Sequence, residues 1–415
     1  MNPSQASVNE AIAKLSNSAD PAVRELARRV QTGDTSTVSD ATTRGHISGG
    51  DNRVSADEFR ARVDALVQDF GVPLKHAHRD ARLFRGETLA DHGRALLARA
   101  GVKIKGGSGE AWQRSFDMRR SGGHGTSDLP ALVENIATVA ALAGWDSAPV
   151  SYDRWCRIGA LRDYRPESRA GLSAHPTLTE VSEGAEIPRV ARGSRAEHIT
   201  ARHFSAMFSV SRQLVLGDHA AAIAREPAAA GRAARMTVQR EVTRLLTTAA
   251  GVGPTLEQDN VALFDAATHG NYVASSGAAP SVTTLSAARK AMRTRVDPVS
   301  GEVLNIVPRV LLVPAALESS ARILAASNNT MVGDAEGDLV VAVDPLLDAV
   351  SATAWYLVAD GAVFDTLEVA FLQGIAAPRL ENRHGWSIDG TDFKISLDFG
   401  VACLDFRGMY RNVGA

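Results

Sequence analysis

His124, Ser127 and Asp128 are the residue types of a nucleophilic triad, in which histidine activates serine and a carboxylate orients the histidine. In this chain they stand within one short stretch, GGHGTSDLP. Residues this close in sequence rarely converge as a triad must. A glycine-rich junction followed by a helix cap uses the same residue types. We therefore expect these three residues to have a structural role rather than a catalytic one.

Asp265 and His269 stand one helical turn apart in the stretch LFDAATHGNY, a spacing that could flank a metal ion. A protein zinc site needs at least three protein ligands, and no third candidate stands nearby. We therefore expect this pair to stabilise a loop, and we predict no metal site.

Charged residues of both signs gather in the segment Thr177–Arg212. The carboxylates of its first limb could suggest cation binding. Arginines follow them around a Gly-Ser turn, which favours a solvated or intersubunit ion-pair face instead. The residues that we predict at a subunit interface are Glu180, Glu183, Glu186, Arg189, Arg192 and Arg195.

Other chemistry finds little support in the sequence. It contains no GxSxG, Walker, HExxH or dinucleotide-binding GxGxxG motif, so we predict no cofactor. Cys156 and Cys403 lack the spacing of a zinc site or a disulfide framework. We expect both to be buried, inert thiols.

Composition describes a folded chain that is poorly suited to gripping nucleic acid or entering a membrane. Its 415 residues are 45% hydrophobic and 22% charged, enough for two or three domains. Residues 1–125 carry 19 basic against 15 acidic residues, net +4, and the rest carry 26 against 32, net −6. No signal peptide and no run of ~20 apolar residues is present. We expect a protein of the reducing cytoplasm.

Residues 1–120 combine short amphipathic segments with stretches rich in Gly, Ser and Thr. Helical spacing of apolar residues occurs at Val8–Val30, Ala56–Phe70 and Thr88–Ala100. Large apolar residues are sparse between them. We therefore predict separate short helices on flexible joints, without a strong core of their own.

The middle of the chain predicts elements that extend away from their own core, followed by a long helix. A helix should begin near Asp128 and Pro130, and the aromatic and charged stretch YDRWCRIGALRDYRPE predicts an arm on a surface rather than a strand in a sheet. The segment Thr177–Arg212 predicts a long hairpin, whose second strand re-enters a core through alternating residues near Phe208. Pro227–Ala250 then predicts a spine helix of ~24 residues, about 36 Å long.

The remainder predicts a mixed α/β region. Its terminal strand has the clearest alternation, from Phe393 to Cys403, and should pack its apolar face on the spine helix. The other elements that we predict are helices at Thr284–Arg295 and Ala315–Ala326, and strands at Arg309–Val313, Leu339–Val343, Trp355–Val358 and Leu367–Leu372.

An ordered set of stretches resembles the major capsid proteins of tailed phages and prophages, and more narrowly the Mu-like major head subunit group. The stretches are TSDLPALVENIATVAALAGW, LTEVSEGAEIP, FSVSRQLVLGD before a long helix, VALFDAATHGNY and FKISLDFGVACLDFRG. The resemblance covers about residues 120–412. It implies an α+β fold of the Hong Kong 97 type.

The parts of that fold correspond to stretches of this chain. A flexible, mostly helical segment at residues 1–120 would precede a capsid domain at 121–415. Within that domain the resemblance implies an N-terminal arm, an extended loop, a peripheral domain and an axial domain. Their ranges are 126–166 for the arm, 177–212 for the loop, 213–254 and 361–415 for the peripheral domain, and 255–360 for the axial domain.

Two departures from the family pattern bear on maturation. Some relatives lock the shell by a lysine–asparagine bond that starts from the extended loop. This chain has no lysine between Lys105 and Lys290, which excludes that bond here. In relatives with a fused prohead protease, a complete protease domain precedes the capsid domain, and residues 1–120 are too short for one. They resemble a remnant or a scaffolding segment that is removed during maturation.

The resemblance implies a structural, non-enzymatic major head protein that assembles with itself into pentamers and hexamers of an icosahedral phage head. The head would enclose double-stranded DNA, contacted without sequence specificity. Prohead protease, portal and decoration proteins are the further partners implied. We expect assembly in the bacterial host cytoplasm and a final location in the virion.

Two other functions stay open. The first is a self-processing protease in the front segment, although no nucleophile–base pair stands out there. The residues that could serve it are Ser108, Ser115, His76, His78 and His92. The second is an encapsulin-like compartment, which keeps the fold and changes the cargo.

Overall fold

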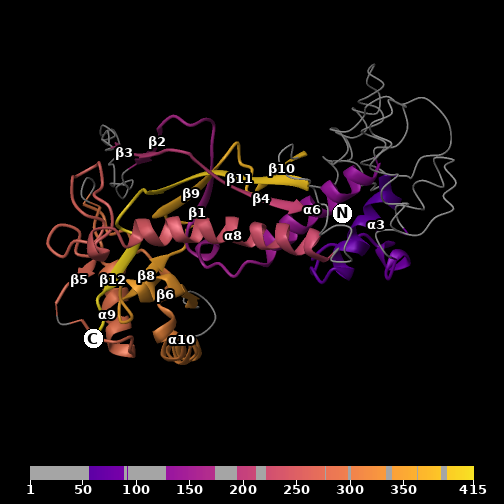
Figure 1. Cartoon of the computed structure of the whole chain (residues 1–415). Coiled ribbons are helices and arrows are strands. Elements are labelled where there is room, and N and C mark those ends of the chain that lie inside the picture. Colours follow the sequence, from indigo (N-terminus) through magenta and orange to yellow (C-terminus); the bar gives the residue numbers. More distant parts are fainter. Residues whose placement is uncertain are drawn as a thin grey trace, which may run out of the picture. The chain divides into compact units, whose positions relative to one another are not determined.

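The computed structural model describes residues 56–87, 91, 128–172, 194–211, 221–275, 277–297, 301–332, 339–361, 363–384 and 390–415. Residues Val54–Ala415 form one compact unit. Within the described part, helices combine with two five-stranded sheets and one two-stranded sheet (Figure 1). The predicted α+β fold class is confirmed.

Two long helices form the frame, α6 (Asp128–Ser147) and α8 (Ala221–Leu246) (Figure 1). The spine helix that we predicted at Pro227–Ala250 is α8, with 26 residues. It begins earlier than predicted, so that Pro227 lies inside the helix and is not its start signal. The residues that α8 buries against the largest core are Val238, Val242 and Leu246.

The crossing of α6 and α8 is built from small residues. A Cβ placed on Gly144 would lie 1.9 Å from the carbonyl oxygen of Ala228, and one placed on Gly231 would lie 1.9 Å from that of Ala141. Real side chains do not approach backbone this closely. Glycine at both positions therefore lets the two helix backbones touch.

The first sheet carries the longest strand of the described chain. Its strand order is β1-β9-β11-β10, and β4 pairs with β11. The ranges are β1 (Arg157–Leu161), β4 (Arg202–Ser211), β9 (Leu367–Leu372), β10 (Arg379–His384) and β11 (Gly390–Cys403). The apolar side chains of β11 share the largest core with α8, as predicted for the terminal strand. Phe204 and Phe208 of β4 stack on Phe399 and Phe393 of β11.

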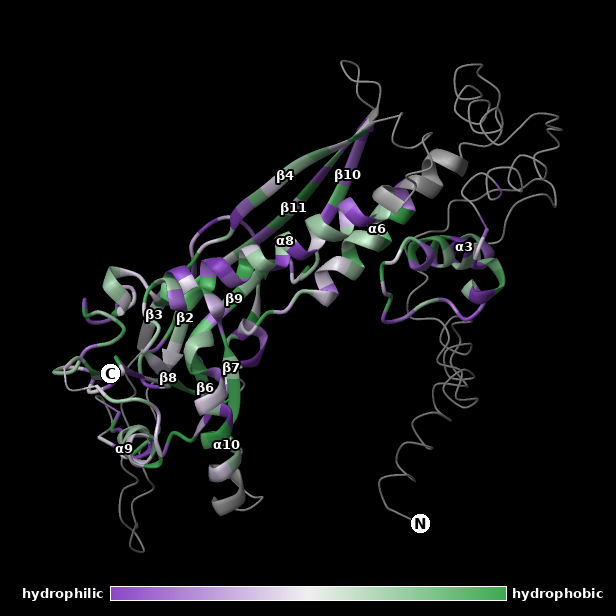
Figure 2. Cartoon of the chain, turned by 60° about the horizontal axis from the view of Figure 1, so that its bottom comes forward, coloured by the Kyte–Doolittle hydropathy of each residue, from purple (hydrophilic) through white to green (hydrophobic). Residues whose placement is uncertain are grey.

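The second sheet has the order β5-β12-β8-β6-β7. Its strands β6 and β7 are hydrophobic along most of their length (Figure 2). The ranges are β5 (Tyr272–Val273), β6 (Pro308–Val313), β7 (Val340–Val343), β8 (Trp355–Ala359) and β12 (Met409–Asn412), with helices α9 (Val282–Arg293) and α10 (Glu318–Val332). The predicted elements of this region are confirmed within a few residues at their ends. Neither β5 nor β12 was predicted.

The prediction of a surface arm after Pro149 is wrong for its central part. Arg157–Leu161 forms β1, which pairs in parallel with β9 at the edge of the first sheet. Its burial is confined to one end, at Leu161, while Arg157 and Ile158 are exposed. An edge strand buried at one residue carries no regular alternation, which is why the pattern was missed.

The front of the described chain is a helix followed by a short 3₁₀ turn, α3 (Ala56–Asp69) and η1 (Ala81–Phe84). α3 confirms the helix predicted at Ala56–Phe70. Its buried residues Val63, Leu66 and Val67 lie in a cluster shared with α6, so α3 is packed on the body although it has few large apolar residues for a core of its own. The other two amphipathic segments, Val8–Val30 and Thr88–Ala100, fall almost wholly outside the described residues.

A buried hydrogen-bond network joins the spine helix to two loops, one that contains Ser151 and Tyr152 and one that contains Asp344. The side-chain oxygen of Gln239 accepts from the backbone N–H groups of Ser151 and Tyr152, at 2.9 and 3.0 Å. Its amide nitrogen donates to Asp344 at 2.9 Å, and the Thr243 hydroxyl donates to the same carboxylate. Burial raises the pKa of the Asp344 carboxyl, against the pull of these donors. One side chain of α8 thus fixes two loops at once.

Short 3₁₀ turns complete the description, and their ranges are η3 (Tyr152–Arg154), η4 (Ala249–Gly251), η5 (Ala315–Leu317) and η6 (Pro345–Ala349). Among the described residues, no helix has the length and apolar character needed to cross a bilayer.

Candidate assembly interface

The two-stranded sheet is the root of the predicted hairpin. β2 (Glu167–Leu172) pairs antiparallel with β3 (Ser194–Ile199), so the hairpin begins ten residues before the predicted Thr177. Of the six predicted interface residues, Arg195 lies in β3, opposite Gly171. The other five lie outside the described residues, as do His124 and Ser127. The structure therefore describes how the hairpin is held rather than how its far part is arranged.

Arg169 ties β2 to the first sheet. Its guanidinium Nε donates to Glu368 Oε1 at 3.0 Å, and its terminal nitrogens donate to Glu167 and to the carbonyl oxygen of Ala160, each at 2.7 Å. Glu368 is the second residue of β9 and is 1% exposed. A Cβ on Gly159 would lie 2.0 Å from the Glu368 carboxylate, so glycine leaves the space for this ion pair.

Glu197 ties β3 to the loop after the spine helix. It stands opposite Arg169 in the hairpin register and is buried. Its carboxylate accepts from the backbone N–H groups of Glu257 and Gln258, both at 3.1 Å. Burial raises the pKa of the Glu197 carboxyl, although these two donors act in the opposite direction. His198, the next residue, meets Glu257 at 2.6 Å through its ring nitrogen.

A small apolar cluster lies under the root, where the chain leaves β3 for β4. Its buried members are Leu161, Ile199, Ala201, Ala370 and Ala402. A Cβ on Gly400 would lie 2.4 Å from the carbonyl oxygen of Thr200, so β11 runs directly against this turn. The root is thus fixed by two buried carboxylates and by packing.

Sequence reasoning missed Arg169, Glu197 and Glu368. Arg169 and Glu197 stand among charged or small residues in the sequence, and Glu368 is a single charge within an apolar strand. Their partners lie far away along the chain, as in the pair of Arg169 with Glu368. The charge pattern of the hairpin was the available signal, and it pointed to the far part rather than to the root.

The loop that contains Asp265 and His269 confirms the predicted stabilising role. Asp265 accepts from the backbone N–H groups of Ala267 and Thr268, at 3.0 and 2.6 Å. His269 is buried, meets Asp259 at 2.8 Å and stacks on the ring of Phe406 with centroids 3.8 Å apart. The contacts of both side chains hold the loop in place. In the described parts of the chain, no group of three or more His, Cys, Asp or Glu side chains could hold a metal ion.

The two cysteines are free and buried, as predicted. Burial raises the pKa of both thiols, so the thiolate form is disfavoured. Asp128 is the first residue of α6. In the front segment His76 is exposed, and the ring of His78 accepts from the backbone N–H of Asp80.

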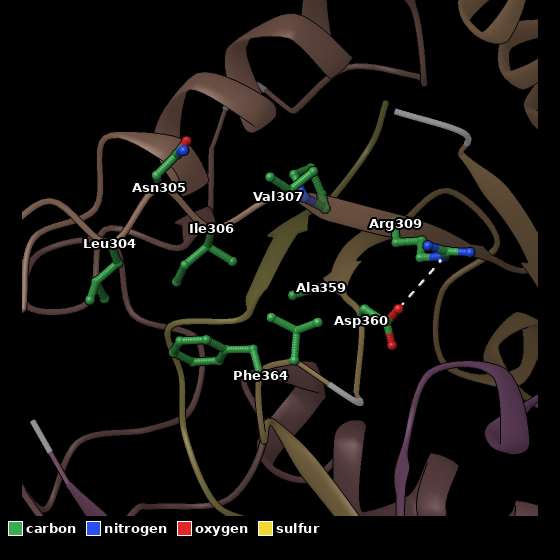
Figure 3. Close-up of a pocket in the computed structure, with 10 residues that line it drawn as sticks. Leu304, Asn305, Ile306, Val307, Arg309, Ala359, Asp360 and Phe364 are labelled. Carbon is green, nitrogen blue, oxygen red and sulfur yellow. Dashed lines mark ion pairs between the residues drawn. The ribbon is translucent and has the colours of Figure 1, made fainter. Parts of the chain in front are cut away.

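A pocket of about 350 Å³ opens beside the second sheet (Figure 3). Ile306, Val307 and Phe364 give it an apolar wall. Arg309 and Asp360, the charged groups among its described lining residues, point toward one another with 3.7 Å between Nε and Oδ2 (Figure 3). This wall offers an apolar surface with no nucleophile beside a base.

Comparison with known proteins gives one decisive match. The family model described as phage capsid protein matches residues 195–412, more than half of the chain. That range begins at Arg195 in the hairpin root and ends in β12. No curated protein matches the chain.

Solved capsid structures show distant similarity. The capsid of the cyanophage P-SCSP1u is 10% identical with a TM-score of 0.44, and covers 65% of this chain and 89% of its own. The head of Helicobacter pylori bacteriophage KHP40 is 10% identical with a TM-score of 0.42, covering 63% and 88%. A virus-like particle from Pyrococcus furiosus is 11% identical with a TM-score of 0.36, covering 66% and 96%. Because these TM-scores are low, the assignment depends on the family match.

The second sheet, the spine helix and the first sheet apart from β1 fall within the matched range, and the chain belongs to the phage capsid protein family as a structural subunit of the phage head.

Proposed function

We propose that the chain is the major head subunit of a tailed phage or prophage of the Mu-like group, and that its copies close into pentamers and hexamers of an icosahedral shell around double-stranded DNA. The root of the hairpin carries this proposal. A two-stranded ribbon gains little burial from itself, yet this one is anchored by two buried carboxylates. Such anchoring suits an element that bears load between subunits.

The far part of the hairpin would lie on a neighbouring subunit in this proposal. Closed symmetric assemblies bury large interfaces, and a projecting charged ribbon needs a partner surface to order it. The residues proposed to form ion pairs there are Glu180, Glu183, Glu186, Arg189, Arg192 and Arg195.

The division into parts is also a proposal. We assign the arm to residues 126–166, the extended loop to 177–212, the axial domain to 255–360 and the peripheral domain to 213–254 and 361–415. The separation into two five-stranded sheets supports it. β12 pairs with β8 of the second sheet, so the range 361–415 contributes strands to both sheets.

Assembly would take place in the bacterial host cytoplasm, with portal, prohead protease and decoration proteins as further partners. The net charge of −6 on residues 126–415 supports non-specific contact with packaged DNA rather than tight binding. We propose no catalytic role. Incubating the purified full chain and measuring its intact mass tests this, because self-cleavage would contradict it.

Reversing charge at the hairpin tests the assembly role. Arg192→Glu with Arg195→Glu should give folded subunits but impaired shells, because the ribbon would lose its ion pairs to the neighbour. Electron microscopy and sedimentation of the expressed chain measure shell yield, and circular dichroism checks folding. The matched control is Arg60→Glu with Arg79→Glu, the same charge change at two exposed residues of the front segment. Normal shells from the hairpin variant would contradict the proposed contact.

A further inference from the structure

The described front residues 56–87, here called the α3–η1 module, bury apolar side chains against the body of the subunit. Val63, Leu66, Val67 and Val72 are at most 5% exposed. They lie in one cluster with side chains of α6, α8, β4 and β11. This module stands before the range matched by the family and before the capsid domain inferred from sequence. It is nevertheless packed as part of the body.

Ion pairs and hydrogen bonds join the parts of the module to one another. Arg62 pairs with Glu58 and Glu87, both at 3.1 Å, and its guanidinium lies 4.3 Å from the ring centre of Phe84. These contacts join the helix to the segment that follows it.

Two carboxylates close the rest of the module. Asp64 accepts from the backbone N–H of His78 at 2.8 Å. Asp69 accepts from Arg85 at 2.9 Å and from the backbone N–H of Gly86 at 2.7 Å. The module therefore has its own fixed form.

The surface beneath the module, here called the seat, is apolar. Its residues in the shared cluster are Ile136, Ala137, Ala140, Val210, Ala224 and Phe393. Arg225 adds a polar contact, with its Nε donating to the carbonyl oxygen of Phe70 at 3.2 Å. A mainly apolar contact surface with one polar contact beside it is typical of the surface between two bound partners.

We propose that the seat is a binding site for the α3–η1 module as a ligand, and that the module stays bound after the chain is cut between residues 88 and 127. A cut in that connection would then not release the whole front segment. The retained peptide would hold α6 and α8 of each subunit together. Removal of residues 1–120 during maturation would require displacement from the seat as well as cleavage.

The proposal is tested on the full chain with a specific protease recognition sequence in place of Gly106–Gly109. Unassembled subunits are cut to completion, passed over a size-exclusion column and analysed by native mass spectrometry. We expect the front fragment to elute with the body as a one-to-one complex. Because the readout needs no shell, it is independent of the proposed function, and a failure of one leaves the other standing.

Two variants of the module make the test specific. Leu66→Asp places a charge in the joint and should reduce fragment retention at least about tenfold. Leu83→Asp makes the same chemical change at a residue that is 69% exposed, and should retain the fragment as the parent chain does. Release of the parent fragment on cutting would overturn the proposal. Equal retention of the Leu66→Asp and parent fragments would overturn it too.

Discussion

The crossing of α6 and α8 and the root of the hairpin solve the same problem, holding two segments tightly, with opposite chemistry. At the crossing, glycine and alanine bring backbone against backbone, with no room for a larger side chain. At the root, Arg169, Glu197 and Glu368 use buried charge and directed hydrogen bonds. Packing fixes distance, whereas paired charge fixes register and direction. The two crossing helices need the first, and the hairpin, which we propose lies on a neighbouring subunit, needs the second.

The largest effect should come from filling the crossing. Gly231→Val would place a branched side chain where a single Cβ already lies 1.9 Å from a carbonyl oxygen. We expect a loss of about 3 kcal/mol in the free energy of unfolding, since the helices must separate. Urea unfolding measures it. Ala229→Val, at an exposed position of the same helix, should cost below about 1 kcal/mol. Equal losses would mean that the close approach is not a constraint.

Breaking the charge pair at the root should cost less. Glu368→Ala leaves Arg169 with one partner fewer in a partly buried place, and we expect a loss of about 2 kcal/mol. Removing both side chains should cost less than the sum of the single losses, because the pair is coupled. Strictly additive losses would argue against the anchor. Glu381→Gln, in an exposed pair with Lys394, is the control and should leave stability unchanged within error.

The smallest effect should be a pH dependence that arises at Glu197. Burial raises its folded pKa above the unfolded value, so the protonated form is favoured by folding. The stability that it contributes is present below the unfolded pKa and lost as pH rises through the folded pKa. Glu197→Gln removes this loss. The free energy of unfolding of the variant relative to the parent should therefore increase from pH 4 to pH 7, as measured by urea unfolding. A difference that does not change with pH would contradict the assignment to Glu197.

Sequence was sufficient for elements whose pattern is local. The spine helix and the terminal strand follow from the spacing of Ala234, Val238 and Val242 and from the alternation around Phe399. Element ends were less accurate, since Pro227 looked like a helix start and lies within the helix. Propensity rules describe a first turn well but do not exclude proline further in when packing supports the helix.

The root of the hairpin could not be read in the same way. Arg169 and Glu368 are far apart in sequence, and each is an ordinary charged residue until β1 pairs with β9. β1 itself was missed because only Leu161 is buried in it. α3 was recognised as a helix, but the burial of Leu66 depends on packing against α6, which lies far along the chain. Long-range pairing, not local preference, determines these features.

The connection from β3 into β4 has a mechanical consequence. β4 follows β3 after two residues and pairs with β11 over ten positions, from Arg202 with Phe399 to Ser211 with Gly390. A force that pulls on the hairpin parallel to β4 would load the β4–β11 ladder in shear. All its hydrogen bonds would then resist together, whereas a peeling force breaks them one at a time. Tension between neighbouring subunits would thus meet the geometry in which a sheet is strongest.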